Sequence, residues 1–268
     1  MTARIHPSAV IEEGARIGAD VSIGPFCVVG PEVRLGDGCE LRSHVVVAGR
    51  TEIGPRCRIF PFVAIGHDPQ DLKYRGEPTT TTVGADCILR EGVTIHRGTP
   101  NGSGATIVGD RCFFLANAHV AHDCRVGNNV ILSNNVMLAG HVKVGDFAIL
   151  GGGAAVIQHT RVGPHAFVGG MSGLENDLIP FGMAVGDRAR LAGLNLVGLK
   201  RRGFAREEIN ALRHAFEDLF TGEGGVFVER LDAVAERYAG HALVAEVVAF
   251  VRAGGDRHVC MPSGPEPA

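Results

Sequence analysis

The chain has no uninterrupted apolar run of the roughly 18 residues that a membrane-spanning helix needs. Its first ten residues, MTARIHPSAV, lack the apolar core of a signal peptide, so a cytoplasmic location is the default expectation. A surplus of positive charge is also missing, because the formal net charge is −3. Since phosphate binding needs a basic surface, nucleic acid is not expected as the main partner.

The seven cysteines include no CxxC pair, which argues against a structural zinc site. Glycine, in contrast, is abundant, with 38 residues and no Gly-X-Y period. A chain of this kind turns often, so an internal repeat is the first pattern to look for.

Aliphatic side chains recur at every sixth position from Ile5 to Leu174, with breaks at 66–82 and 97–106. The first break keeps the register and replaces one coil's worth of residues, and the second adds one residue. Of the 26 positions, 25 are Ile, Leu or Val, and Phe114 is the exception. A strict period of six fits neither a helix nor an alternating strand. It predicts short strands joined by corners, three to a coil of 18 residues, with stacked coils burying a continuous core.

The other places of the hexad agree with this interpretation. Glycine often follows the aliphatic residue, and it tolerates the positive φ and close backbone approach of a tight corner. The residue four positions after the aliphatic one, in the fifth place of the hexad, is small or β-branched. Six of the seven cysteines occupy this place and are interpreted as core residues. Both breaks are interpreted as loops leaving the coil wall, where repeat proteins usually carry function.

After Leu174 the period of six fades and helical spacing begins. Helices are expected over 206–220, 226–240 and 241–254, the last two ending at Gly240 and Gly254. The predicted fold class is therefore all-β with an α-helical tail. A parallel β-helix is expected over 1–187 and a small helical domain over 188–268, of which 256–268 is expected to be disordered.

Because positions 18 apart lie above one another, the stacking of outward side chains follows from the sequence. Two neighbouring files occupy the third and fourth places of their hexads, which face solvent. They are His122, Gly140 and Gln158, and beside them Asp123, His141 and His159. His119 lies just upstream on the same side.

Three interpretations of this histidine cluster are open. Outward corners tolerate solvated histidines without a function. Zinc binding has a precedent in β-helical carbonic anhydrases, but the spacing of His96, His119 and His122 does not match theirs, so no metal is expected. A general base fits better, because Asp123 can fix the tautomer of His122 and stabilise its imidazolium. No serine or cysteine is in register with this pair, which favours direct attack by a substrate hydroxyl, with the Gly140 N–H as oxyanion donor.

Several segments, in this order and on this repeat, resemble one family. They are VAGRTEIG, IGHDPQDLKYRGEPT, VTIHRGT, NAHVAHDCRVGN, LAGHV and GLKRRGF. The family is that of the UDP-N-acetylglucosamine 3-O-acyltransferases of lipid A biosynthesis, and the likeness runs from about His6 to about residue 220. It implies a left-handed β-helix, a homotrimer with sites between neighbouring β-helices, and no cofactor. The implied reaction is attack of the 3-hydroxyl of UDP-N-acetylglucosamine on an (R)-3-hydroxyacyl group carried by acyl carrier protein.

The resemblance also implies residue roles. His122 matches the general base, Asp123 its orienting partner and Gly140 the oxyanion donor. The residues implied to bind the substrate are Asp71, Lys73, His96, His119, His141, Gln158, Asn195, Arg201 and Arg202. Gly170 falls at the position that limits the acyl chain and Met171 follows it; glycine there leaves the groove open, which favours a longer chain. The basic run that continues into α-helical sequence, Lys200, Arg201, Arg202 and Arg206, suits an acidic carrier.

Three positions depart from the family pattern. Ile157 and Arg188 stand where histidines are common, and Val197 replaces an acidic residue. The Ile157 departure raises the hypothesis that the acceptor is a 3-amino analogue of the sugar, since an amine needs less help from a base.

The hexad is also compatible with three further classes of protein. They are a coenzyme A-dependent acetyltransferase, a non-catalytic scaffold, and the later N-acyltransferase of the lipid A pathway. That N-acyltransferase carries an extra N-terminal domain, for which a repeat that starts at Ile5 leaves no room. The O-acyltransferase therefore stays the favoured interpretation.

Overall fold

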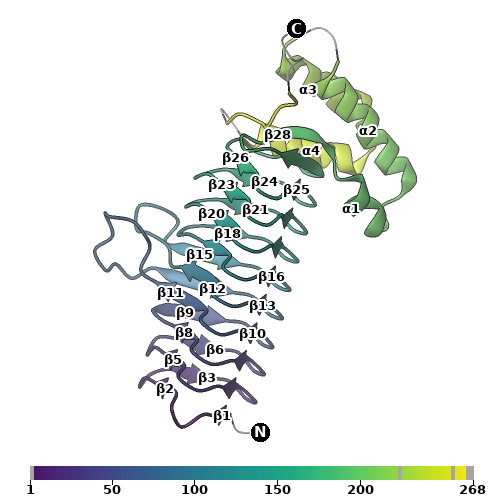
Figure 1. Cartoon of the computed structure of the whole chain (residues 1–268). Helices are drawn as coiled ribbons and strands as arrows, with labels where there is room; N and C mark the ends of the chain where they lie inside the picture. Colours follow the sequence, from purple (N-terminus) through teal and green to yellow (C-terminus); the bar gives the residue numbers. More distant parts are fainter. Residues whose placement is uncertain (1–2, 223–224, 255–256, 264–268) are drawn as a thin grey trace.

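A computed structural model describes residues 3–222, 225–254 and 257–263. A long coil of short parallel strands forms most of the chain and ends in a group of helices (Figure 1). The strands belong to three sheets, named A, B and C here, and the chain passes from A to B to C in each coil. Partners in consecutive coils, such as Ile131 and Ile149, are 18 residues apart, which confirms the calculated stacking.

Sheet A consists of β1 (Arg4–Ile5), β4 (Ser22–Ile23), β7 (Glu40–Leu41), β10 (Arg58–Ile59), β13 (Ile88–Leu89), β16 (Phe113–Phe114), β19 (Ile131–Leu132), β22 (Ile149–Leu150), β25 (Phe167–Val168), β27 (Gly182–Val185) and β28 (Arg190–Leu194). Sheet B consists of β2 (Val10–Ile11), β5 (Val28–Val29), β8 (Val46–Val47), β11 (Ala64–His67), β14 (Thr94–His96), β17 (His119–Val120), β20 (Met137–Leu138), β23 (Ala155–Val156) and β26 (Gly173–Leu174). Sheet C consists of β3 (Arg16–Ile17), β6 (Arg34–Leu35), β9 (Arg50–Ile53), β12 (Thr80–Val83), β15 (Ala105–Val108), β18 (Arg125–Val126), β21 (Lys143–Val144) and β24 (Arg161–Val162).

The aliphatic residue of each hexad points inward and forms the core. Every one of these positions from Ile23 to Leu174 is buried, whereas Ile5 is 44% exposed because no coil lies beneath it. The six cysteines of the repeat are buried as predicted, and Cys260, which lies outside the repeat, is buried as well. The Cys112 thiol, for example, donates to the Gly127 carbonyl oxygen of the next coil at 3.1 Å.

The glycines that follow the aliphatic residues allow close approach between the backbones of neighbouring coils, as predicted. The positive φ that was also predicted for them is not found at Gly36, for example. A Cβ on Gly36 would lie 2.6 Å from the backbone nitrogen of Pro55 in the next coil, although the φ of Gly36 is not positive. Positive φ falls two residues later in the hexad, on residues such as Asn117 (61°) and Asp123 (60°). Asn, Asp and His adopt this left-handed conformation at lower cost than other non-glycine residues.

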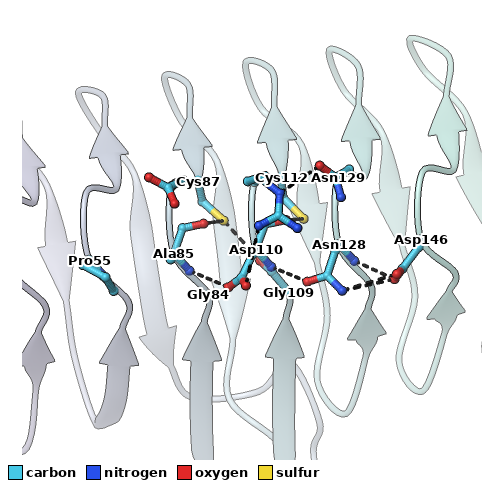
Figure 2. A network of polar contacts seen from close by, with 12 residues as sticks. Pro55, Gly84, Ala85, Cys87, Gly109, Asp110, Cys112, Asn128, Asn129 and Asp146 are labelled. Atoms are coloured by element: carbon cyan, nitrogen blue, oxygen red, sulfur yellow. Dashed lines mark hydrogen bonds and ion pairs between the residues drawn. The ribbon is translucent and has the colours of Figure 1, made fainter. Parts of the chain in front are cut away.

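A ladder of side-chain oxygens closes the corner between sheets C and A (Figure 2). The N–H of Ala85 donates to Asp110 Oδ1, the N–H of Asp110 donates to Asn128 Oδ1, and the N–H of Asn128 donates to Asp146 Oδ1, each at 2.8 Å. These N–H groups lie outside the strands, so the ladder satisfies donors that the sheets leave free.

Both breaks in the repeat are loops, and both leave the corner between sheets B and C. The first loop (68–79) joins β11 to β12, and the second loop (97–104) joins β14 to β15; they project from one side of the coil (Figure 1). The first does not replace a coil. Ile65 in sheet B leads directly to Val83 in sheet C, so the loop adds 12 residues, two hexads, to a step of six. The second adds seven residues to a step of six, not one.

The C-terminal part contains the three predicted helices and one that was not predicted. The helices are α1 (Leu196–Arg201), α2 (Arg206–Phe220), α3 (Phe227–Arg237) and α4 (Ala242–Arg252). Strand pairing continues past residue 187, because β27 and β28 form an antiparallel pair on the last coil. Within the residues that the structure describes, every helix is too short or too polar to cross a membrane.

The expectation of a disordered tail is corrected for residues 257–263. Val259 forms a bridge with Asp177, and the buried Cys260 donates its thiol to the Ala189 carbonyl oxygen at 3.3 Å. This stretch is therefore fastened to the last coil. The other residues of the predicted tail, 256 and 264–268, lie outside the described residues.

Removing one inward side chain should destabilise the coil far more than removing its outward neighbour. Ile53 in β9 is 1% exposed, and Glu52 beside it is exposed. We expect Ile53→Ala to cost about 2–5 kcal/mol, and Glu52→Ala to stay within about 0.5 kcal/mol. Urea unfolding of both variants at one protein concentration measures the difference, and equal costs would contradict the inward assignment.

Candidate active site

The candidate site lies at the corner between sheets B and C, where both loops leave the coil. His122 and Asp123 follow β17 in the third and fourth places of their hexad. The φ of Asp123 is 60°, but the fourth place has a similar φ in other coils, for example 61° at Asn117. The fold therefore imposes this conformation, and it is not strain specific to a functional residue.

His122 and Asp123 form a buried pair. His122 Nδ1 lies 2.9 Å from Asp123 Oδ2, and the two side chains are 11% and 0% exposed. Because a carboxylate can only accept here, the neutral imidazole carries its proton on Nδ1 and keeps a lone pair on Nε2. Nε2 has no hydrogen-bond partner in the described parts of the chain. The pair thus presents an imidazole nitrogen with a lone pair that can accept a proton.

The second loop covers Asp123, and His122 is buried beside it, so the predicted solvent-facing wall is wrong at both residues. The Asp123 carboxylate accepts from Thr99 Oγ1 at 2.6 Å, from the Thr99 N–H and from the Gly104 N–H at 3.1 Å. Burial raises the pKa of Asp123, but the hydrogen bonds from Thr99 and His122 outweigh it and lower the pKa overall. Asp123 is therefore ionised at neutral pH. A Cβ on Gly102 would lie 2.4 Å from the carboxylate, so the loop closes tightly.

Gly140 lies one coil beyond His122 and against its ring. A Cβ on Gly140 would lie 2.5 Å from Cε1 and 2.7 Å from Nε2 of His122. The Gly140 N–H donates no hydrogen bond among the residues that the structure describes. A free backbone donor thus stands beside the free imidazole nitrogen, which is the arrangement that an oxyanion donor requires.

Further histidines line the same corner. The His141 ring meets the His122 ring edge-on at 5.0 Å and stacks on His159 at 4.4 Å. Burial lowers the pKa of His141, and the nearby Asp123 and Asp71 carboxylates oppose this only in part. The Asp71 carboxylate of the first loop is therefore near enough to His141 to influence its pKa.

His96 and His119 lie at the base of the corner. Their rings meet edge-on at 5.0 Å, and His119 Nδ1 is 2.7 Å from Thr94 Oγ1. Burial, followed by the charge of His119, lowers the pKa of His96 to about 4. Its Nδ1 is buried without a partner in the described part of the chain. His96 is thus neutral at pH 7 and has an unused polar atom.

Arg97, which was not predicted, holds the first loop in place. Its guanidinium forms an ion pair with Asp68 and lies 5.3 Å from the centre of the Tyr74 ring. Beyond this anchor, the Asp71 carboxylate accepts from the Lys73 N–H at 2.9 Å, while the Lys73 side chain is exposed.

Other predicted site residues lie at different corners of this chain. The Asn195 side chain caps α1, accepting from the Gly198 N–H at 3.0 Å and donating to His165 O at 2.9 Å. Arg202 donates to Phe147 O at 2.9 Å, and its guanidinium lies over the Phe147 ring. Phe147 lies between β21 and β22, so these residues are at the corner between sheets C and A. The exposed Arg201 ends the same helix.

Gly170 and Met171 lie at the third corner, between sheets A and B. Both are exposed, and the Met171 thioether extends over Gly153 of the preceding coil. Gln158 and Ile157 are exposed beyond Gly140, at the corner of His122. One chain therefore brings together the predicted residues around His122, but not Asn195, Arg201, Arg202, Gly170 or Met171.

One group of the described residues can offer three metal ligands. His122, Asp123 and His141 each place a ligand atom within 4.8 Å of the others. The Asp123 oxygens already accept hydrogen bonds from Thr99, Gly104 and His122. A metal would have to replace these bonds, so proton transfer suits the arrangement better.

The repeat and the fold define a class, the hexapeptide-repeat transferases. Residues 14–49 and 105–140 match bacterial transferase hexapeptide repeats, and 177–260 match "Udp N-acetylglucosamine O-acyltransferase; Domain 2". A relative from Methylobacterium radiotolerans, named acyl-[acyl-carrier-protein]–UDP-N-acetylglucosamine O-acyltransferase, is 67% identical over 96% of this chain and 94% of its own. A relative of the same name from Rhizobium johnstonii is 53% identical over 98% of this chain and 96% of its own.

Solved structures agree. The UDP-N-acetylglucosamine acyltransferase of Campylobacter jejuni is 37% identical, with a TM-score of 0.90 over 97% of this chain and 100% of its own. The UDP-N-acetylglucosamine acyltransferase of Francisella novicida is 35% identical, with a TM-score of 0.92 over 98% of this chain and 95% of its own. This chain belongs to the acyl-[acyl-carrier-protein]–UDP-N-acetylglucosamine O-acyltransferase family. The predicted family and the left-handed parallel β-helix are confirmed.

A methyl group on Gly140 should push the His122 ring away from Asp123. We expect Gly140→Ala to break the Nδ1–Oδ2 hydrogen bond, because the new Cβ would overlap Cε1. Histidine side-chain ¹⁵N NMR measures the loss of the bonded Nδ1–H signal. Gly30→Ala, whose Cβ would meet nothing closer than 3.5 Å, is the control and should leave the signal intact. An unchanged His122 signal in Gly140→Ala would refute the close contact.

Proposed function

We propose that this protein transfers an (R)-3-hydroxyacyl group from acyl carrier protein to the 3-hydroxyl of UDP-N-acetylglucosamine, the first step of lipid A biosynthesis. The observation that carries the proposal is the His122–Asp123 pair with a free Nε2 beside the free N–H of Gly140. The names of relatives that are 50–67% identical over nearly the whole chain support both substrates. Because acyl carrier protein and nucleotide sugars are cytoplasmic, we propose a cytoplasmic location for this protein.

In the proposed mechanism, His122 acts as a general base. Nε2 takes the proton of the sugar 3-hydroxyl as its oxygen attacks the thioester carbonyl, and the buried Asp123 carboxylate stabilises the imidazolium that forms. The Gly140 N–H donates to the oxyanion of the tetrahedral intermediate. When the intermediate collapses, the carbon–sulfur bond breaks and the imidazolium returns the proton to the departing thiolate. The products are the 3-O-acyl sugar nucleotide and the free carrier thiol.

A covalent acyl-enzyme is not part of the mechanism. The thiol nearest in sequence to the pair, Cys124, is fully buried, and burial raises its pKa to about 12. A thiol protonated at neutral pH and buried in the coil is not a nucleophile. Direct attack by the acceptor hydroxyl remains.

The acceptor is proposed to lie between the first loop and the corner histidines. Asp71 and Lys73 reach it from the loop, and His119 and His141 from the coil. The 3-amino acceptor suggested by Ile157 is not favoured, because the relatives are named O-acyltransferases. The acyl chain is proposed to run towards Gly170, whose lack of a side chain leaves room for it.

A homotrimer would complete the site. Sheet A carries an outward apolar column, which consists of Ile88, Phe113, Ile131, Ile149 and Phe167. An apolar face of this extent is expected to be covered. If it packs against sheet B of a neighbour, the corner with Asn195 and Arg202 meets the corner with His122. Three chains related by rotation then close a ring with three such sites.

The acid–base pair is tested by His122→Ala and Asp123→Asn. We expect His122→Ala to lower kcat about a hundredfold or more. Asp123→Asn should lower it comparably, because the amide donates to Nδ1 and forces the imidazole proton onto Nε2. Steady-state kinetics with acyl carrier protein thioester and UDP-N-acetylglucosamine measures both, with thermal unfolding as a check on folding. Full activity in either folded variant would reject the mechanism.

The assembly is tested by a charge on sheet A. We expect Ile131→Lys to yield monomers of 28.2 kDa with little activity, because its outward side chain lies in the apolar column and not in the core. Light scattering after gel filtration gives the mass. Arg34→Glu, at the equivalent outward place on sheet C, should remain trimeric. A monomeric wild type would contradict the proposal.

A further inference from the structure

Sheet C carries a line of cations on its outward face, which we call the sheet C ladder. Arg125, Lys143 and Arg161 occupy the same outward place in β18, β21 and β24 and pair in register. Neighbouring strands are about 4.8 Å apart, so three positive charges follow one another along the coil axis. Like charges directly opposite on neighbouring strands destabilise a sheet.

The ladder has little compensating negative charge. Arg125 and Lys143 are exposed and have no carboxylate partner within residues 3–222, 225–254 and 257–263. Arg161 binds Asp177 at 2.6 Å, but Arg257 binds the other oxygen of the same carboxylate at 2.9 Å. One buried acid thus serves two guanidinium groups. On a chain with a net charge of −3, this local surplus points to an anionic ligand.

The ladder adjoins the candidate active site. Arg125 is two residues after Asp123, and a cavity of about 540 Å³ beside the ladder is also lined by Asp123, His141 and His159. Sheet C is the face that the proposed trimer leaves uncovered. The basic run at α1 is partly engaged, because Arg202 is held against Phe147. In the ladder, Arg161 is held in a similar way by Asp177 and the Phe250 ring, so Arg125 and Lys143 carry its exposed charge.

We propose that the sheet C ladder docks the acidic surface of the acyl carrier protein. This inference rests on the proposed function, which requires a donor carried by that protein. A row of cations one strand apart matches an elongated row of carboxylates better than it matches a single phosphate. The thioester is attached through a long flexible arm, so the carrier can bind on sheet C while the acyl group reaches His122 around the corner. Charges of this kind act mainly on the rate of association.

The test reverses two charges of the ladder. We expect Arg125→Glu/Lys143→Glu to raise the KM for acyl carrier protein thioester about tenfold or more at low salt. The kcat and the KM for UDP-N-acetylglucosamine should stay within about twofold, and the defect should shrink at high salt. The control is Arg16→Glu/Arg34→Glu, which reverses two paired arginines on the outward face of sheet C near its other end. An equal defect in the control would overturn the proposal.

A truncated donor separates the protein surface from the phosphate of the arm. With the acyl phosphopantetheine thioester alone, wild type and Arg125→Glu/Lys143→Glu should have equal kcat/KM. A loss of the same size with this donor would overturn the docking role, since the ladder would then bind the phosphate. A rise in the KM for the sugar nucleotide alone would overturn it as well, in favour of an acceptor site.

Direct binding keeps this inference distinguishable from the proposed function. Fluorescence anisotropy of labelled holo acyl carrier protein measures docking without turnover. One outcome is that wild type binds the carrier, the charge-reversed variant does not, and no acyl group is transferred by either. This outcome supports carrier docking on the sheet C ladder and contradicts the proposed function. If acyl transfer occurs and both proteins bind the carrier equally, the ladder fails and the proposed function stands.

Discussion

The structure depends on one constraint, the pairing of each strand with the strand one coil further on. The Ile131 N–H donates to the Ala148 carbonyl oxygen at 3.0 Å, and the His141 N–H donates to the His122 carbonyl oxygen at 3.0 Å, so strands and corners obey the same spacing. Because every coil repeats this pattern, a residue's place in the hexad decides whether it is core, sheet face or corner. The file of His122, Gly140 and Gln158 is a consequence of that pairing.

The corners differ in chemistry and not in backbone shape. At the corner between sheets C and A, Asp110, Asn128 and Asp146 bind backbone N–H groups and hold the coils together. At the corner between sheets B and C, the equivalent third places hold His122, Gly140 and Gln158. Asp123 follows in the fourth place, and the second loop supplies the donors that it needs. The fold thus provides a rigid frame on which the same corner geometry serves either cohesion or catalysis.

The three faces also differ in what they present to the surroundings. Sheet A is apolar in its middle, which suits burial against another copy. Sheet C carries the exposed cations Arg125 and Lys143, which have no carboxylate partner among the described residues and suit an anionic partner. In one chain, the residues around His122 and those around Arg202 occupy separate corners. The proposed trimer and the proposed carrier docking use different faces, so assembly and donor binding need not compete.

The sequence alone determined the period, and through it the core, the place of six cysteines, the stacking of His122 under Gly140 and the two points at which loops leave the coil wall. It also marked three of the four helices by their apolar spacing. Only the tertiary structure decided the length of the loops, because an insertion of two hexads leaves a period of six unchanged. The tertiary structure also revealed that Thr99 and Gly104 cover Asp123 and that Arg97 anchors the first loop. It further showed that residues 257–263 contact the last coil. Loops and tails have no period, so their contacts depend on a backbone path that no spacing encodes.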